Sequence, residues 1–309
     1  MKKKNKLNIK KIIVFLIILG IIAGLYINFK NKKNQNIVRD EIEQGEITNQ
    51  NVNINQDNDK KEENIAPSKS LLEEKLESGK YLSDSGLPVL MYHFFYDKNE
   101  REPQDGNWIE INDFDAQMKY LSENDYYFPN FKELRKYVDG ELTLPEKSCV
   151  ITMDDGHADN YTIAYPLAVK YKVPITMFVV TSWTDVTQDL QKEMFDTGYV
   201  YFMSHTDEMH EGTLITSIGY ETGVNDLKTS ASKLGKGKGL TYENEFNGDA
   251  LAYPTGANND NSYPIVRDAG FKLAFTVDYG HVHPGDDPLT LPRVRISQGN
   301  DLDYFKAGL

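Results

Sequence analysis

The sequence CVITMDDG, residues 149–156, is a short apolar run that ends in two adjacent carboxylates and a glycine. Similar apolar runs recur along residues 86–309 and alternate with segments of helical period, which indicates βα units around a mainly parallel sheet. We expect strands at 88–92, 149–153, 175–180, 199–203, 250–253, 271–276 and 291–296. We expect helices at 113–123, 131–138, 160–171, 188–196, within 221–234, at 263–268 and at 302–307. The predicted fold class is α/β, a distorted (β/α) barrel with about seven strands, whose chemistry should lie at the C-terminal strand ends.

The N-terminal part has a different composition. Residues 12–29 are uncharged and almost entirely apolar, and as a helix they would rise about 27 Å, close to the ~30 Å hydrocarbon core of a membrane. We therefore expect a basic cytoplasmic tail at 1–11, one transmembrane helix at 12–29, a disordered tether at 30–85 and a folded domain at 86–309. A cleaved signal peptide is the alternative, although no small-x-small cleavage site follows the apolar run.

The charge of the chain is distributed unevenly. The chain has 34 basic and 47 acidic residues and a net charge of −13. Nine lysines precede position 34, which leaves 25 basic against 47 acidic residues, a net charge of −22, for the rest. The flanking lysines favour a cytoplasmic N-terminus, so the folded domain should be extracellular on a single-pass bacterial membrane protein. Such an acidic body excludes nucleic acid as a partner, and the single cysteine, Cys149, excludes an intramolecular disulfide.

Asp154 and Asp155 stand at the end of a predicted strand. Adjacent residues on a strand point to opposite faces, so both can reach one site only if the chain already turns there. Gly156 permits that turn. Taken alone, this motif is more typical of a solvated turn before a helix.

The second motif, SHTDEMH at 204–210, also follows an apolar run and contains two histidines five residues apart. His205 and His210 share neither a helix face nor a strand face, so the chain must bend between them to form one site. Taken alone, two histidines on one loop are more often solvated than metal-bound. One Asp oxygen and two imidazole nitrogens, however, form a ligand set that leaves positions open for water and substrate, as expected of a catalytic metal. The spare carboxylate is then a candidate general base.

These two motifs, TMDDG and SHTDEMH, resemble the first two motifs of the NodB-type polysaccharide deacetylases, carbohydrate esterase family 4. The spacing of five between the histidines resembles the branch that contains the poly-β-1,6-N-acetylglucosamine N-deacetylases. Further resemblance lies in VLMYHFF at 89–95, AYPTG at 252–256, and FTVDYG and DDPLTLPRVRI within 275–296.

The resemblance implies that Asp155, His205 and His210 bind a divalent metal, Zn²⁺ first and otherwise Co²⁺, Ni²⁺ or Fe²⁺. Asp154 would be the base, and the backbone N–H of Thr255 would bind the oxyanion. Two departures from the family pattern are visible. Ala252-Tyr253 stands where many members have an arginine that orients the base, and the final Leu-x-x-His motif is not evident.

These departures leave two roles to other residues. Arg293 is our candidate for the cation that orients the base. His93, His281 and His283 remain open as candidates for the general acid.

The sequence thus predicts an extracellular, membrane-anchored, metal-dependent N-deacetylase that releases acetate from a GlcNAc-containing polysaccharide, with poly-GlcNAc preferred over peptidoglycan. A carbohydrate-binding barrel that has lost turnover and an O-acetyl esterase using the same site are the alternatives. The native metal, the polymer, the oligomeric state and cleavage of the anchor are left open by the sequence.

Overall fold

The computed structural model describes residues 70–183, 188–210, 212–234 and 250–309 of the 309-residue chain. The expected basic tail, transmembrane helix and most of the tether fall outside these residues. Among the described helices, none has the length and apolar character needed to cross a membrane.

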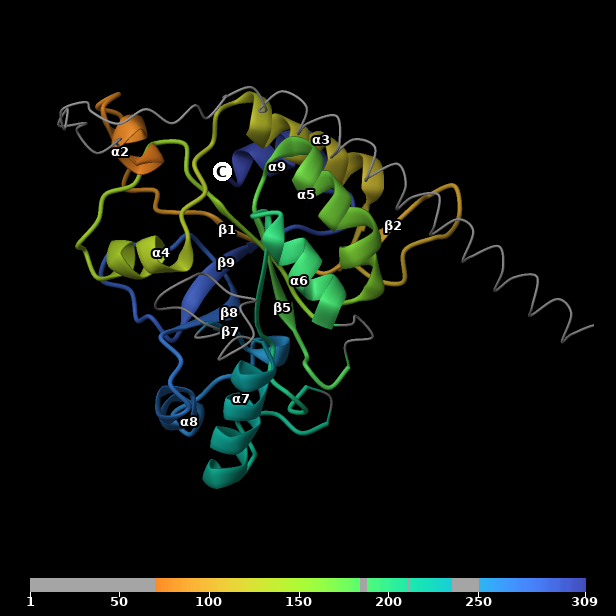
Figure 1. Ribbon diagram of the computed structural model, residues 1–309, viewed down its shortest axis with the longest axis vertical. Helices are drawn as coiled ribbons and strands as arrows, with labels where there is room; N and C mark the ends of the chain where they lie inside the picture. The colour runs from red at the N-terminus through yellow and green to blue at the C-terminus, as the bar shows by residue number, and fades with distance from the viewer. Residues whose placement is uncertain (1–69, 184–187, 211, 235–249) are drawn as a thin grey trace, which may run out of the picture. The chain divides into compact units, whose positions relative to one another are not determined.

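Seven parallel strands form a closed barrel in the order β1-β4-β5-β6-β7-β8-β9 (Figure 1). The first and last strands close it through pairing of Leu90 with Val294 and of Met91 with Arg295. Only Ser204 and Leu251 pair between β6 and β7, which makes the barrel irregular there. The seven strands correspond to the seven predicted apolar runs, with ends shifted by up to three residues; they are β1 (Val89–Tyr92), β4 (Val150–Met153), β5 (Ile175–Val179), β6 (Val200–Ser204), β7 (Ala250–Ala252), β8 (Leu273–Tyr279) and β9 (Leu291–Arg295).

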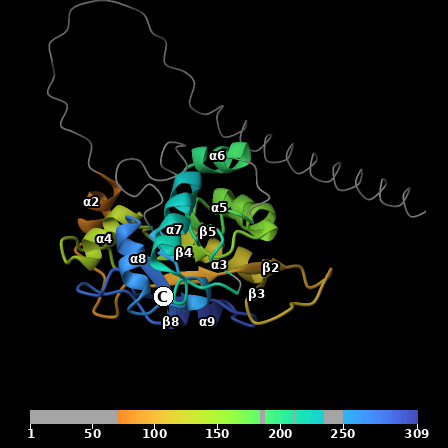
Figure 2. The same cartoon turned by 90° about the horizontal axis from the view of Figure 1, so that it is seen from below.

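Helices connect most of these strands and cover the outside of the barrel. The predicted helix at 160–171 begins instead as a π-helical turn, η1, and only then becomes α5. α2, α4 and α8 lie on one side of the barrel, and α5 lies on the other (Figure 1, Figure 2). The helical elements are α2 (Leu71–Leu76), α3 (Ile111–Glu123), α4 (Phe131–Val138), η1 (Asn160–Ala164), α5 (Tyr165–Tyr171), α6 (Gln188–Asp196), α7 (Tyr220–Leu234), η2 (Pro254–Gly256), α8 (Ser262–Asp268) and α9 (Leu302–Ala307).

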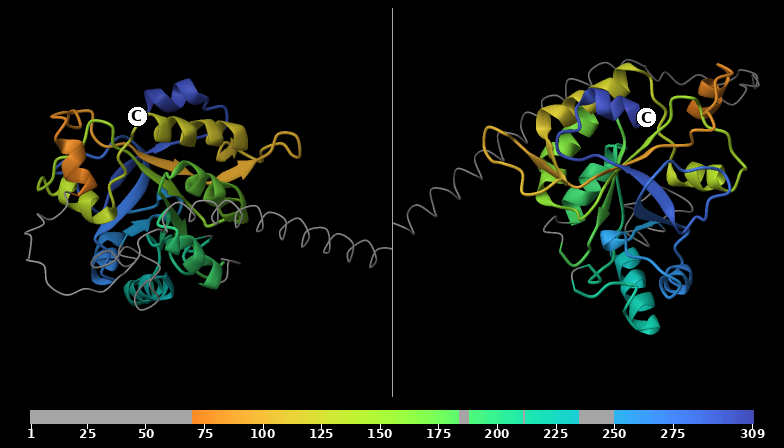
Figure 3. Two further views of the ribbon diagram at one scale, coloured as in Figure 1. Left: turned by 45° about the horizontal axis from the view of Figure 1, so that its top comes forward. Right: turned by 180° about the vertical axis from the view of Figure 1, so that it is seen from behind.

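A two-stranded parallel sheet, β2 (Phe94–Tyr96) and β3 (Trp108–Glu110), follows β1 and is absent from our sequence prediction. Each strand has three residues, which is too short to produce a recognisable alternation. Their connection, residues 97–107, extends outward from the barrel in both views of Figure 3.

The ordered domain begins earlier than the boundary that we predicted at residue 86. Ser70 caps α2 through a capping box with Glu73, and Tyr81 forms an antiparallel bridge with Pro145. Leu72 and Leu82 pack against the apolar cluster beneath β1 and α4. The C-terminal end of the predicted tether is therefore part of the folded domain. Our prediction missed this because the average composition of residues 34–85 is polar and includes only a few apolar residues.

Successive residues of each barrel strand point alternately to the interior of the barrel and to the outer helices. Ile151 and Met153 of β4 belong to the cluster that packs against the outer helices, while Val150 belongs to a second cluster that contains Phe131, Phe178 and Phe275. These three rings contact one another at centroid separations of 5.6 to 6.2 Å. Thr152 and Asp154 continue the Val150 face, and this face carries polar groups toward the C-terminal end of the barrel.

Candidate active site

The chain turns at Asp155, immediately after β4. Asp155 has φ +72° and Gly156 has φ +74°, so the carboxylate that would point outward on a straight strand is redirected toward the site. A Cβ atom at Gly156 would lie 2.7 Å from Cγ1 of Val179. Glycine is therefore required here both by its positive φ and by the close approach of β5.

Asp154 and Arg293 form a buried ion pair within the barrel. Nη1 and Nη2 of Arg293 donate to Oδ1 and Oδ2 of Asp154 at 2.8 and 2.7 Å. Nε of Arg293 donates to the carbonyl of Thr276, and Nη1 also reaches Oγ1 of Thr152. Both charged residues are at most 1% exposed. The structure thus places Arg293, our candidate for the cation that orients the base, in direct contact with Asp154.

The charge state of Asp154 depends on this pair. Burial raises the pKa of Asp154, but the Arg293 guanidinium outweighs burial and holds that pKa below its ordinary value. Asp154 is consequently ionised at neutral pH, as a base must be before it accepts a proton.

Asp155, His205 and His210 converge at the end of β4 and β6. Nε2 of His205 lies 3.3 Å and Nε2 of His210 lies 3.1 Å from Oδ1 of Asp155. One potential ligand atom from each residue lies within 4.8 Å of the other two. The predicted bend between the histidines is present, because Thr206 has φ +77°.

The hydrogen bonds of these residues fit a cation. Nδ1 of His205 lies 2.7 Å from the carbonyl of Ala252, and a carbonyl only accepts, so Nδ1 carries the proton. A neutral His205 then turns the lone pair of Nε2 toward a carboxylate oxygen. Burial lowers the pKa of His205, and the Asp155 carboxylate opposes burial and raises it above the ordinary value. The lone pair of Nε2 and those of the Asp155 carboxylate oxygen repel each other unless a proton or a metal ion lies between them. Two nitrogens and one oxygen are a suitable ligand set for a divalent transition metal.

The loop with the two histidines is braced by hydrogen bonds that our sequence interpretation missed. Oγ1 of Thr181 and Nζ of Lys233 donate to Oδ1 of Asp207 at 2.5 and 2.6 Å. The backbone N–H groups of Asp207 and Glu208 donate to the two carboxylate oxygens of Asp226. The only signal for this brace in the sequence is Asp207 itself, inside the second motif, since its partners are far away in the chain.

Thr255 lies in the turn η2 after β7, with φ +58°. The same strand end supplies the Ala252 carbonyl that binds His205. Non-glycine residues rarely adopt a positive φ, and Asp155, Thr206 and Thr255 all do so. Each of the three lies in a loop that carries a predicted site residue. Residues in such strained backbone conformations are common at functional sites.

The three histidines considered for the general acid occupy different places. His93 follows β1, and its Nε2 lies 3.9 Å from Oδ2 of Asp154. Burial lowers the pKa of His93, against the opposite effect of Asp154 and Asp155. His281 and His283 instead hydrogen-bond to the backbone carbonyls of residues 84, 85 and 308.

Those contacts separate His281 and His283 from the site. Val282, between them, pairs with Leu87 at the start of β1, whereas His93 follows the end of that strand. The six residue steps from Leu87 to His93 span about 20 Å in an extended chain. The structure therefore brings only His93, of these three candidates, next to Asp154.

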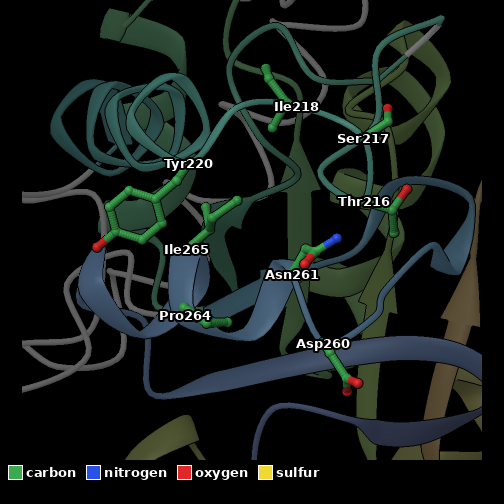
Figure 4. Close-up of a pocket in the computed structure, with 8 residues that line it drawn as sticks. All are labelled: Thr216, Ser217, Ile218, Tyr220, Asp260, Asn261, Pro264 and Ile265. Atoms are coloured by element: carbon green, nitrogen blue, oxygen red, sulfur yellow. The ribbon is translucent and has the colours of Figure 1, made fainter.

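A separate hollow lies between the segment after His210 and the start of α8 (Figure 4). Its volume is about 530 Å³. It is lined by hydroxyl, amide, carboxyl, aromatic and aliphatic side chains, namely Thr216, Ser217, Ile218, Tyr220, Asp260, Asn261, Pro264 and Ile265. Both lining segments continue from loops that carry predicted site residues, His210 on one side and Thr255 on the other.

Comparison with known proteins identifies the family. Residues 141–274 match the family model of the polysaccharide deacetylases. The poly-β-1,6-N-acetyl-D-glucosamine N-deacetylase of Staphylococcus aureus is 29% identical over 203 residues, which cover 61% of this chain and 68% of that protein.

Two solved structures have the same fold. IcaB from Ammonifex degensii matches with a TM-score of 0.58 and 25% identity, over 74% of this chain and 97% of that one. BC0361, a polysaccharide deacetylase from Bacillus cereus, matches with a TM-score of 0.59 and 26% identity, over 72% and 68% of the two chains. The matched range contains both motifs and Thr255, and residues 141–274 therefore lie in a polysaccharide deacetylase domain of the NodB type, carbohydrate esterase family 4.

Proposed function

We propose that this protein is a metal-dependent deacetylase that removes N-acetyl groups from GlcNAc residues of a cell-surface polysaccharide and releases acetate. The observation that carries the proposal is the convergence of Asp155, His205 and His210 beside the buried Asp154–Arg293 pair. The residues combine a candidate cation site with a separate ionised carboxylate, which are the two parts that metal-assisted hydrolysis of an amide uses.

In this proposal the residues of the chain have distinct roles. Asp155, His205 and His210 hold the metal. A divalent metal, when bound, polarises the acetamide carbonyl and lowers the pKa of a neighbouring water. Asp154, kept ionised and oriented by Arg293, takes the proton of the attacking water. The backbone N–H of Thr255 donates to the oxyanion, and loss of such a donor costs roughly 3–4 kcal/mol in comparable sites. His93 gives a proton to the departing amine.

A polymer fits the surroundings of this site. The hollow beside the His210 and Thr255 loops offers the hydroxyl, amide, carboxyl and aromatic groups that commonly bind sugars. It lies outside the group of residues that would perform the chemistry, and we propose it as a place for a sugar of the polymer other than the one that reacts. Poly-β-1,6-GlcNAc is the preferred polymer because of the five-residue histidine spacing and the Staphylococcus aureus relative, and peptidoglycan is the next candidate.

The proposed location rests on sequence alone. The apolar segment 12–29 and its flanking lysines favour a single membrane-spanning anchor, a cytoplasmic N-terminus and an extracellular catalytic domain. Residues between the anchor and α2 would then connect the enzyme to the membrane.

The test of the proposed function is acetate release from both polymers by chelator-treated protein with and without added Zn²⁺ or Co²⁺. We expect metal-dependent release that is faster from poly-β-1,6-GlcNAc. Equal turnover of peptidoglycan would remove the substrate preference. Release only from O-acetylated sugars would make the protein an esterase, and sugar binding without acetate release would make it a binding protein.

A further inference from the structure

Trp183 is an exposed tryptophan that contacts a predicted metal ligand. It follows β5, and its ring centroid lies 4.4 Å from that of His210, with an interplanar angle of 63°. The residue is 44% exposed, whereas the side chain of His210 is only 13% exposed. Trp183 therefore covers His210 on one side and presents apolar surface to solvent on another.

The backbone that holds Trp183 is fixed to the histidine loop. The N–H groups of Thr181 and Ser182 donate to the carbonyls of Thr206 and Asp207. Oγ of Ser182 donates to the same Asp207 carbonyl, and the N–H of Trp183 donates to Val180. These bonds continue the β5–β6 pairing beyond the strand ends, so the position of the Trp183 backbone is coupled to that of the His205–His210 segment.

The other tryptophan of the chain has an ordinary packing role. Trp108 is 4% exposed, and the Arg101 guanidinium lies over its ring at 4.3 Å. Phe94 contacts it at a centroid distance of 5.1 Å. Since Trp108 has almost no free surface, it cannot offer a face to a ligand. Trp183 buries less of its ring than a core residue does, and an exposed large apolar side chain beside a polar site is a common feature of ligand binding.

We propose that Trp183 is a carbohydrate-binding subsite, on which one ring of a β-linked hexosamine chain packs beside the metal ligands. In β-linked glucosamine units the polar substituents are equatorial, so each ring face presents C–H groups that match an aromatic surface. This proposal rests on the proposed function. In it, Trp183 binds the sugar ring, and other residues act on the acetamide group.

The kinetic test compares Trp183→Ala and Trp183→Phe with the wild type on acetylated β-1,6- and β-1,4-linked GlcNAc pentamers. We expect Trp183→Ala to raise KM about tenfold, with kcat and Zn²⁺ affinity changed by less than about threefold, and Trp183→Phe to recover most of the loss. Hydrolysis of p-nitrophenyl acetate, which has no sugar ring, should be unchanged. Tyr81→Ala is the matched control, since Tyr81 is 51% exposed and pairs with Pro145, at the opposite end of the barrel.

A binding test does not depend on turnover or on correct folding of the alanine variant. The chain has only two tryptophans, so Trp183→Phe leaves the buried Trp108 as the sole indole. We expect the pentamers to reduce acrylamide quenching of wild-type fluorescence at least twofold in metal-free protein. The same addition should leave the quenching of Trp183→Phe unchanged.

The outcomes separate the subsite from the proposed function. Turnover by the wild type with unchanged KM in Trp183→Ala and no protection from quenching would overturn the subsite alone. A loss of kcat and Zn²⁺ affinity at constant KM would show that Trp183 only packs on His210, and would also overturn it. Protection without acetate release would retain the subsite and reject the deacetylase.

Discussion

Arg293 holds both carboxylate oxygens of Asp154 inside the barrel, at 2.8 and 2.7 Å, although 139 residues separate the two in the chain. Arg293 lies on β9 and Asp154 follows β4, so β1 stands between their strands in the barrel order. Arg293 therefore stands, from another strand, beside the carboxylate that we propose as the base. It orients Asp154 and keeps it ionised although Ala252-Tyr253 supplies no arginine at the third motif.

The role of Asp154 as base predicts the effect of its amide. Asp154→Asn should lower kcat for deacetylation by at least about a thousandfold, because an amide cannot take the proton of the attacking water. Zn²⁺ affinity should change little, since Asp154 is not among the three converging ligands. Acetate release and calorimetric zinc titration on the same preparation check both statements. An Asp154→Asn protein that retained a tenth of the wild-type rate would contradict the role.

Loss of the partner of Asp154 should make stability depend on pH in a defined direction. In the wild type the lowered pKa of Asp154 gives stability that is present above the ordinary value of 3.8 and is lost as pH falls through the lower folded-state pKa. Arg293→Met leaves a buried carboxylate without its cation, which should cost about 3–5 kcal/mol at pH 7 and raise the pKa of Asp154 above 3.8.

Urea unfolding at pH 7 and at pH 4.5 measures this effect. The difference in unfolding free energy between wild type and Arg293→Met should narrow at the lower pH, where the isolated carboxyl of the variant can take up a proton. Arg293→Met combined with Asp154→Asn is the control and should show a much weaker pH dependence. A constant difference at both pH values would contradict the assignment.

The three-ligand site predicts that removal of one ligand weakens metal binding strongly. His210→Ala should reduce Zn²⁺ affinity by at least about a hundredfold, because two ligands no longer define a site. His157→Ala is the matched control, since its side chain is 43% exposed and forms a contact with Asp159 instead. Competition with a zinc-binding dye gives both affinities. Equal Zn²⁺ affinities of His210→Ala and His157→Ala would contradict the role of His210 as a metal ligand.

His93 as general acid predicts dependence on the leaving group. His93→Gln should lower amide hydrolysis about a hundredfold, because an amine leaves only after it gains a proton. Hydrolysis of p-nitrophenyl acetate should change less than about threefold, since its leaving group needs no proton. His281→Gln and His283→Gln, whose rings bind backbone carbonyls, should retain both activities. A parallel loss of amide and ester hydrolysis in His93→Gln would reject the role.

The sequence was sufficient to predict the barrel because each of its strands is a separate apolar run. It was also sufficient to group the Asp154–Asp155 pair with His205 and His210, since all follow such runs and the active sites of parallel barrels lie at C-terminal strand ends. The choice of Asp155 as the ligand came from the family resemblance. The two-residue period of a strand also explains why the side chain of Arg293 lies inside the barrel. Arg293 is two residues after Leu291, which belongs to the inner cluster, so both point to the same face of β9.

Other features depend on contacts that a linear pattern does not contain. The sequence could not separate His93 from His281 and His283, because the fold-back of Val282 onto Leu87 is a tertiary pairing. The β2–β3 sheet pairs two three-residue strands across a charged loop. The hydrogen bonds to Asp207 join three separate elements, and the packing of residues before position 86 onto the domain depends on a few leucines within a polar segment.

The most direct measurement is acetate release from poly-β-1,6-GlcNAc by chelator-treated protein, before and after addition of Zn²⁺, for the wild type and Asp154→Asn. We predict that the wild type is inactive without metal and active with it, and that Asp154→Asn is inactive in both conditions. No acetate from the wild type with any divalent metal, or equal metal-independent release by both proteins, would contradict it.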